Sequence, residues 1–238
     1  KGMQSTKSNQ QTPNEIVLKE LKIVPQRTDN YRTVANRFWD ILETDLSVSF
    51  NWGKHECLGT ISIWMKPYFY ESDSIELDAK AMVFHGVQIL DQNKQEVLYT
   101  LHYNKSKLAL KLERKFSAKD SLLVKINYTA KPDEVEQTGS QAIKEGKGLY
   151  FINTNHADAH KPIQVWTQGE TEANSCWFPT IDKPNEKFLM RVSITVNKEL
   201  TTLSNGQLVS SIEDGNRRTD VWKSKHPMPA YLVMMAVG

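Results

Sequence analysis

The sequence predicts an all-β protein made of antiparallel strands, arranged as a sandwich or an open barrel. Apolar and polar residues alternate over short stretches, which is the pattern of strands that bury one face and expose the other. These stretches recur at regular intervals, as in antiparallel sheets, and turn signals are clearer than helix signals. The alternating runs cover residues 46–51, 61–65, 75–77, 108–112, 122–129 and 190–196.

The N-terminal residues are predicted to form a leader followed by one helix. Residues 1–29 begin with a polar stretch rich in Gln, Ser and Thr, so we expect a partly disordered leader. Residues 30–238 are then expected to form the folded domain. Tyr31–Leu42 is expected to form a helix, because its apolar residues fall at helical spacing. These residues are Val34, Phe38, Ile41 and Leu42.

Turn signals organise the second half of the chain. Asn205–Gly206 and Asp214–Gly215–Asn216 each predict a tight hairpin connection. Residues 207–213 between them are expected to form a short strand, and residues 231–237 a further one. Residues 131–147 are polar and contain glycine, which predicts a long surface loop.

Composition narrows the class of protein. The chain has 238 residues, of which 39% are hydrophobic and 24% charged, and this is ample for a globular core. The formal net charge of +2 gives no electrostatic reason to expect a nucleic-acid partner. No apolar run approaches the roughly 18 residues of a membrane helix, so no transmembrane segment is expected.

The sequence contains two cysteines, Cys57 and Cys176. They form no CxxC motif and are too few for a disulfide framework. Both lie in segments that could be buried, so a single disulfide and two free thiols both remain open.

Two groups of residues contain metal-ligand side chains. His55-Glu56-Cys57-Leu58-Gly59 begins like a zincin helix, but Gly59 stands where the second histidine is needed, and the surrounding alternation indicates a strand. His156, Asp158 and His160 would share one face of an extended segment. Their neighbours are typical of an exposed loop, which we favour over a zinc site.

The stretch Thr167–Pro184 carries the clearest chemical signal. Its prolines exclude an ordinary helix or strand. If the chain is extended here, Gln168 and Glu170 project from one face, and an amide beside a carboxylate could receive a ligand ammonium group. A surface turn with a solvated Glu170 is the alternative. Asp182 is expected to cap a short helical turn that contains Pro184.

These residues resemble a known signature. Gln168-Gly169-Glu170, Phe178-Pro179 and Asp182-Lys183-Pro184 are similar to the Gln-x-Glu … Phe-Pro-x-x-Asp-x-Pro pattern in the N-terminal β domain of the M1 zinc aminopeptidases. Residues 66–70, Lys-Pro-Tyr-Phe-Tyr, are similar to bacterial, aminopeptidase N-like members. The resemblance covers roughly residues 30 to 238 and implies a saddle-like domain of antiparallel sheets. Gly169 departs from the Phe or Cys that is common in the family.

The resemblance also implies a function. M1 enzymes remove N-terminal residues from peptides with a zinc-activated water. Their zinc and exopeptidase motifs lie in the following catalytic domain and do not occur here, so no zinc site is expected in this chain, which alone should be inactive. By carry-over, Glu170 would help to bind the free amine of a peptide substrate, and Gln168 would line the pocket for its first side chain. The partners implied are that peptide N-terminus and a downstream catalytic domain.

Several questions stay open at this level. A non-catalytic scaffold derived from the same family is the alternative, and a free-standing β-sandwich adhesion or carbohydrate-binding module is a second one. The polar leader favours the cell envelope or secretion over the cytoplasm. The residue preference at the first substrate position, the oligomeric state and the state of the downstream zinc motifs are not determined.

Overall fold

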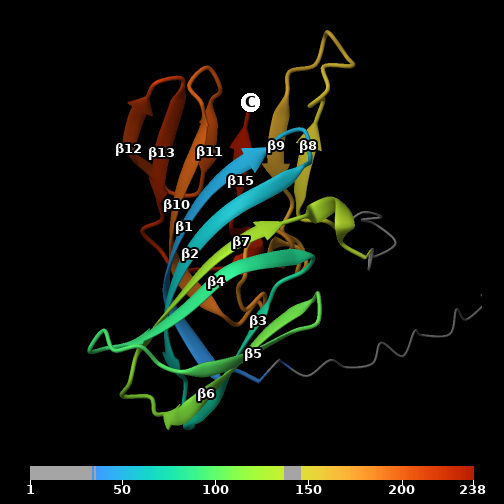
Figure 1. The fold of residues 1–238 in the computed structure, drawn as a ribbon. Helices are drawn as coiled ribbons and strands as arrows, with labels where there is room; N and C mark the ends of the chain where they lie inside the picture. The colour runs from blue at the N-terminus through green and yellow to red at the C-terminus, as the bar shows by residue number, and fades with distance from the viewer. Residues whose placement is uncertain (1–33, 35, 137–145) are drawn as a thin grey trace, which may run out of the picture. The chain divides into compact units, whose positions relative to one another are not determined.

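A computed structural model describes residues 34, 36–136 and 146–238, and this part of the chain is built almost entirely of strands (Figure 1). Among the described residues, the remaining elements are three short 3-10 helices, and no helix is long and apolar enough to cross a membrane. The bounds are β1 Trp39–Asn51, β2 Glu56–Pro67, β3 Ser72–Asp78, β4 Met82–Asp91, β5 Tyr99–Tyr103, β6 Lys107–Phe116, β7 Leu122–Ala130, η1 Pro132–Glu134, β8 Leu149–Ile152, β9 Gln164–Thr167, η2 Asn174–Cys176, β10 Lys187–Asn197, β11 Thr202–Ser204, β12 Gln207–Asp214, β13 Arg217–Lys223, β14 Met228–Pro229, η3 Ala230–Leu232 and β15 Met235–Val237.

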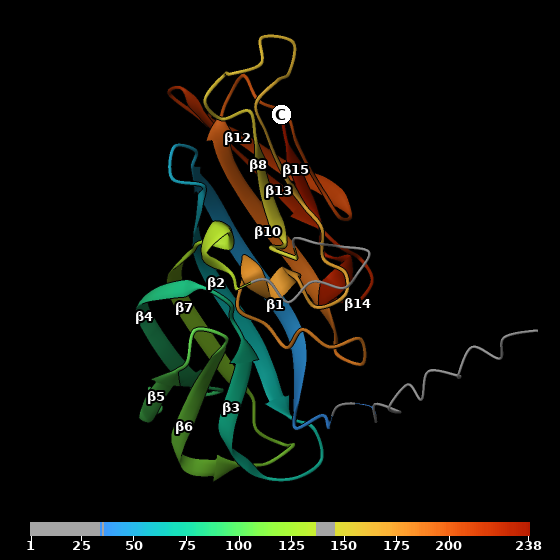
Figure 2. The ribbon, with the colours of Figure 1, turned by 90° about the vertical axis from the view of Figure 1, so that its right-hand side faces the viewer.

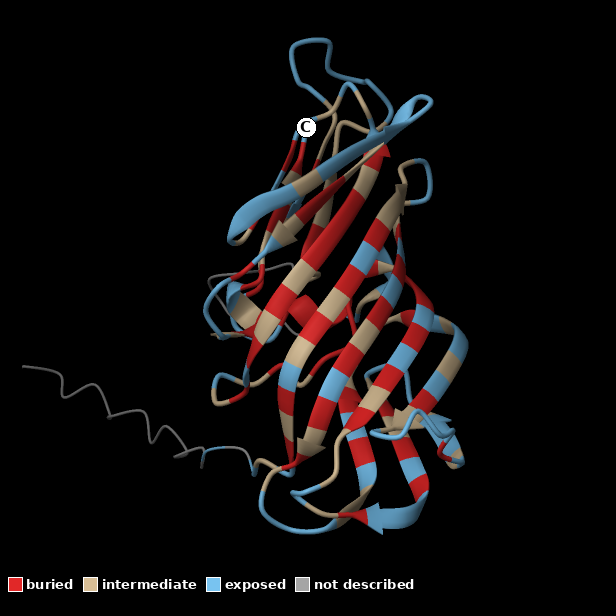
Figure 3. Ribbon diagram, turned by 90° about the vertical axis from the view of Figure 1, so that its left-hand side faces the viewer, coloured by how far each residue is buried: buried red, intermediate tan, exposed pale blue. Residues whose placement is uncertain are grey.

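The largest sheet has the strand order β12-β13-β10-β1-β2-β7-β4, with β14 paired to the start of β10. Its central pair β1 and β10 is parallel, whereas the other neighbours are antiparallel. Along β2 and β7, buried residues alternate with more exposed ones as expected from the sequence, whereas the edge strand β12 is exposed along nearly its whole length (Figure 3). The alternating runs predicted in the sequence all fall within strands, so the all-β assignment is confirmed.

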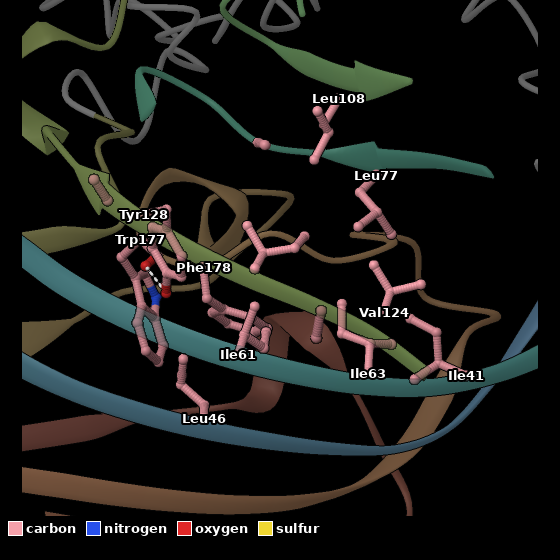
Figure 4. Packing of buried hydrophobic residues seen from close by; sticks show 14 of the residues in the cluster. Ile41, Leu46, Ile61, Ile63, Leu77, Leu108, Val124, Tyr128, Trp177 and Phe178 are labelled. Carbon is pink, nitrogen blue, oxygen red and sulfur yellow. Dashed lines mark hydrogen bonds between the residues drawn. The ribbon is translucent and has the colours of Figure 1, made fainter. Parts of the chain in front are cut away.

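Two smaller sheets complete the fold. The four-stranded sheet has the order β11-β15-β9-β8, and the three-stranded sheet has the order β3-β6-β5. Figures 1 and 2 show the first beside one end of the large sheet and the second beside the other end. Buried residues of all three sheets join in one hydrophobic core, and part of this core is drawn in Figure 4. Three sheets around one core give an open sandwich without a closed barrel.

The helix expected at Tyr31–Leu42 is wrong where the structure describes it. Residues 36–38 have no regular structure and β1 begins at Trp39. Trp39 and Ile41 alternate into the core, but a bulge after Ile41 shifts the register, and Leu42 faces solvent. The bulge places apolar residues at a spacing that imitates a helix, while pairing with β2 decides the conformation. Residues 31–33 and 35 lie outside the described residues.

The expected hairpin at Asn205–Gly206 is only half right. The turn exists, and Gly206 has a positive φ of 90°, but the strands on either side of it do not pair. Strand β11 joins β15, while β12 joins β13 in another sheet. The Asn205 side chain explains the change of sheet, since it accepts a hydrogen bond from the Met234 amide and donates one to the Leu232 carbonyl. The hairpin at Gly215 and the strand over residues 207–213 are confirmed.

Three further expectations need correction. Residues 231–237 do not form one strand, because η3 (Ala230–Leu232) turns the chain before β15 begins at Met235. The predicted loop 131–147 begins with the short helix η1, and its residues 137–145 lie outside the described part. Cys57 and Cys176 are both buried free thiols, so the disulfide alternative is wrong.

Candidate functional site

The segment between β9 and β10, residues 168–186, links all three sheets and is called the β9–β10 segment below. It leaves the four-stranded sheet after Thr167 and enters the large sheet at Lys187. Midway, the Tyr128 hydroxyl of β7 donates a hydrogen bond of 2.9 Å to the Trp177 carbonyl (Figure 4). Further on, Thr180 pairs through its backbone with Asp78 at the end of β3. A segment fixed at so many points can present side chains with little freedom to move.

Two aromatic residues anchor this segment in the core. Trp177 and Phe178 are fully buried, and their rings meet edge to face with centroids 4.5 Å apart (Figure 4). Buried aromatic side chains of this size contribute strongly to core packing. The two residues therefore belong to the scaffold of the site and do not face a ligand.

Asn174 fastens the segment to the C-terminal residues. Its side-chain amide donates to the carbonyls of Ala230 at 2.5 Å and Val233 at 2.7 Å. Its carbonyl oxygen accepts from Trp177 Nε1 at 2.7 Å. The residue is fully buried, so these bonds satisfy groups that water cannot reach. The sequence did not point to Asn174, because the two carbonyls that its side-chain amide contacts lie more than 50 residues away along the chain.

Gln168 and Glu170 lie together at the start of the segment. The two side chains do not simply project in parallel, because Gln168 Oε1 accepts a hydrogen bond of 3.0 Å from the Glu170 backbone amide. The Gln168 side chain thus holds the backbone at Glu170. The peptide bond after Glu170 is cis.

Gly169 lets the chain pass close to a neighbouring backbone. The residue is buried, and a Cβ atom on it would lie 2.3 Å from the carbonyl oxygen of Tyr231 and 2.6 Å from Asn174 Nδ2. No side chain fits at these distances. The sequence showed the departure from Phe or Cys at this position, and the structure supplies its reason.

Glu170 and Glu172 differ sharply in their surroundings. Glu172 pairs with Lys183 at 2.7 Å, and its backbone carbonyl accepts from Lys80 Nζ at 2.5 Å. Glu170 is exposed, and within residues 34, 36–136 and 146–238 its carboxylate has no hydrogen bond or ion pair. Of the two acidic side chains, Glu170 is the one available to a ligand.

Asp182 does not cap the turn that contains Pro184. Its carboxylate points back into the protein, where Oδ2 accepts a hydrogen bond of 2.9 Å from the Ser175 amide in η2. Asp182 therefore caps a turn seven residues earlier in the chain. The sequence predicted a local cap, whereas the tertiary fold brings a distant turn to the carboxylate.

The residues around His55 do not form a zincin helix. Instead, the His55 side chain connects two loops through hydrogen bonds. The strand expected there is confirmed from Glu56 onward. His55 Nδ1 lies 2.7 Å from Asp133 Oδ2, and Nε2 lies 2.8 Å from Thr154 Oγ1. Asp133 also pairs with Lys147, and these contacts hold its carboxyl pKa below the ordinary value although burial acts to raise it. The imidazole thus joins the β1–β2 turn to the β8–β9 loop.

His156, Asp158 and His160 are exposed in the loop between β8 and β9, as the favoured interpretation expected. Asn153 organises this loop through hydrogen bonds to the backbone of Asp158 and Lys161. The Asp158 carboxylate accepts from the His160 amide. No group of three or more His, Cys, Asp or Glu side chains among the described residues could hold a metal ion.

Known proteins share this sequence pattern. Residues 29–232 match the family model of the peptidase M1 N-terminal domain. Aminopeptidase B of Mus musculus is 26% identical over 106 residues, which are 44% of this chain and 16% of that protein. The puromycin-sensitive aminopeptidase of Caenorhabditis elegans is 27% identical over 133 residues, which are 53% of this chain and 14% of that protein.

Solved structures share the fold. A mutant M1 zinc metallopeptidase from Deinococcus radiodurans, bound to a Tyr-Ser-Ala substrate, covers 87% of this chain and 44% of its own length, with a TM-score of 0.70 and 17% identity. Native yeast LTA4 hydrolase covers 84% of this chain and 29% of its own length, with a TM-score of 0.62 and 22% identity. The chain therefore spans less than half the length of each of these proteins.

Proposed function

Because the chain belongs to the family of peptidase M1 N-terminal domains, we propose that it forms one wall of the substrate site of a zinc-dependent aminopeptidase. The single observation that carries this proposal is the state of Glu170. Its carboxylate is exposed and has no partner among the described residues, while the segment around it is held at Tyr128, Asp78 and Ala230. An available charge on a fixed backbone is suited to binding a cation.

The ligand group that fits Glu170 is the protonated α-amine of a peptide. A charge-assisted hydrogen bond of this kind contributes roughly 1.5–3 kcal/mol when it is partly shielded from water. The names of the relatives support the assignment, since two of them are aminopeptidases and one related structure holds a short peptide. An enzyme that removes N-terminal residues must recognise this amine.

Gln168 has a supporting role in this proposal. Its Oε1 atom accepts a hydrogen bond from the Glu170 amide, which holds the backbone that carries the carboxylate. Its side-chain NH₂ group remains to line the pocket for the first side chain of the substrate. The specificity of that pocket would depend on the rest of the enzyme.

Zinc would be bound elsewhere in the enzyme. The described residues include no cluster of three or more His, Cys, Asp or Glu side chains that fits the ion, and within the β9–β10 segment Glu172 pairs with Lys183 while Asp182 accepts a hydrogen bond from the Ser175 amide. The chain would therefore help to bind and orient the peptide substrate. The metal-assisted step would take place in a catalytic domain, for which the longer relatives have room. We expect the isolated chain to show no aminopeptidase turnover.

The test is a pair of variants in the full-length protein. Glu170→Ala should lower kcat/KM for an aminoacyl chromogenic substrate by about 10- to 100-fold, because each 1.4 kcal/mol of lost binding corresponds to a factor of ten. Glu172→Ala should have a much smaller effect, since its carboxylate pairs with Lys183. Equal effects of the two substitutions would remove Glu170 from the site.

A second measurement separates the enzyme from a scaffold. If purified full-length protein with zinc shows no turnover on any N-terminal residue, the non-catalytic family scaffold is the better assignment. A zinc-dependent aminopeptidase activity of the isolated chain would also contradict the proposal, because the chain would then contain its own zinc site and catalytic residues.

A further inference from the structure

Asp182 is a buried carboxylate that the proposed function leaves without a role. It is 1% exposed, and its Oδ2 atom accepts the Ser175 amide at 2.9 Å. Its Oδ1 atom is buried and has no hydrogen-bond partner in the described part of the chain. An unpartnered buried oxygen is costly, and more so when it is charged. A native structure that keeps such an atom requires an explanation.

The charged groups around Asp182 do not compensate for its burial. Asp78, at the end of β3, accepts the backbone amide of Asp182 at 2.9 Å, which places a second carboxylate nearby. Lys80 directs its ammonium group to the Glu172 carbonyl, and Lys183 pairs with the Glu172 carboxylate. The Cys176 thiol is neutral, because burial raises its pKa to about 12.

The environment therefore favours the protonated carboxyl. Burial raises the pKa of Asp182 to about 6, with a further rise from Asp78, while the Ser175 hydrogen bonds and Lys80 oppose the shift. The ordinary value is 3.8. A group of this kind changes its charge in the range just below neutrality.

We propose that Asp182 is a positioning residue whose protonation tightens the β9–β10 segment around Gln168 and Glu170. The path between them is short. Asp182 caps η2 at Ser175, and the adjoining Ala173 amide donates to the Gly169 carbonyl at 2.9 Å. Gly169 stands directly between the two site residues. The consequence for substrate binding rests on the proposed function, whereas the titration of the segment does not.

The direction of the effect follows from the raised pKa. The folded segment prefers the neutral carboxyl, so the stabilisation is complete below pH 3.8 and is lost as the pH rises through about 6. Local opening that exposes Asp182 to water should be about tenfold rarer at pH 5 than at pH 7, since one pKa unit corresponds to a factor of ten.

The decisive experiment uses the chain itself. The carboxyl carbon of Asp182 should titrate near pH 6 by NMR. Hydrogen exchange at the Ser175 amide, corrected for intrinsic rates, should show about tenfold greater protection at pH 5 than at pH 7. Asp182→Asn keeps the oxygen that accepts from Ser175 and should remove this pH dependence. Asp214→Asn, at the exposed end of β12, is the matched control and should leave it unchanged.

The results that overturn the inference are equally definite. Titration of Asp182 near its ordinary value, or protection of Ser175 that changes less than twofold between the two pH values, contradicts it. The first of these is measured on the unmutated chain, so it decides the matter even if Asp182→Asn fails to fold.

In the full-length enzyme, Asp182→Asn should flatten the pH profile of KM between pH 5 and 7, whereas Glu170→Ala should raise KM throughout. If Glu170→Ala leaves KM unchanged while Asp182 titrates near pH 6, the proposed function is contradicted and the titration of Asp182 is not. An unchanged KM profile in Asp182→Asn, alongside a clear Glu170 effect, would contradict a positioning role for Asp182.

Discussion

The hydroxyl of Tyr128 donates a hydrogen bond of 2.9 Å to the carbonyl oxygen of Trp177, and both residues are fully buried. Tyr128 lies on β7 of the large sheet, between β2 and the edge strand β4, and Trp177 belongs to the β9–β10 segment. Gly59 lies opposite Tyr128 on β2, where a Cβ atom would come within 2.2 Å of the phenol ring. The missing side chain at Gly59 thus lets the ring cross the sheet face and fasten the candidate site to the core.

Tyr128→Phe should destabilise the protein by about 1–3 kcal/mol, because it leaves the Trp177 carbonyl buried without a donor. The ring itself still fits, so the loss reports the hydrogen bond. Urea unfolding monitored by circular dichroism gives the difference in free energy. Tyr70→Phe, at an exposed position, should lie within about 0.5 kcal/mol of the unchanged protein. Equal stability of Tyr128→Phe and the unchanged protein would show that the bond carries no net energy.

Gly169→Ala should be more damaging than an ordinary glycine substitution. The new methyl group would lie 2.3 Å from the Tyr231 carbonyl oxygen, so the backbone of the segment must move. We expect a loss of more than about 1 kcal/mol of stability, as for other overpacked positions. Gly86→Ala is the matched control, because the nearest atom there is an amide nitrogen at an ordinary 3.9 Å. If both variants melt at the same temperature, the close approach at Gly169 is not limiting.

Asn174→Ala should cost about 3–5 kcal/mol, in the range found when a buried hydrogen-bond network is broken. The substitution leaves the carbonyls of Ala230 and Val233 without a donor and Trp177 Nε1 without an acceptor. Chemical unfolding measures the loss. Gln207→Ala, at an exposed position on β12, should remain near the unchanged protein. A cost below 1 kcal/mol would mean that water replaces the lost partners.

Both cysteines should resist thiol reagents in the folded protein. Burial raises the pKa of each thiol, that of Cys176 to about 12, so almost no thiolate is present at pH 8. Ellman's reagent should therefore react slowly with the native chain and with two thiols after unfolding in guanidinium without a reductant. Rapid reaction in the native state would show that these segments open easily, and absence of thiols after unfolding would reveal a disulfide.

Much of the fold could be predicted because strand alternation is a local property. The runs containing Ile61 and Val124 show their buried face directly in the order of residues. The β9–β10 segment was also visible, since its prolines and carboxylates stand out from the strands on either side. Predictions from local patterns failed where the pairing between strands determines the conformation. The apolar residues 38, 41 and 42 have a helical spacing, but they lie at or just before the start of β1, where a bulge interrupts the strand alternation. The sequence pattern does not reveal that bulge.

The sequence by itself determined the class of the fold, the family signature and the two residues, Gln168 and Glu170, that we propose for substrate binding. Only the tertiary structure decided which groups surround them. It paired Lys183 with Glu172, while the Glu170 carboxylate has no partner among the described residues. It also brought Asn174 to Ala230 and Val233, and turned Asp182 toward Ser175. The physical reason is that burial and hydrogen bonding depend on distance in space, and these contacts arise only when the three sheets close around one core.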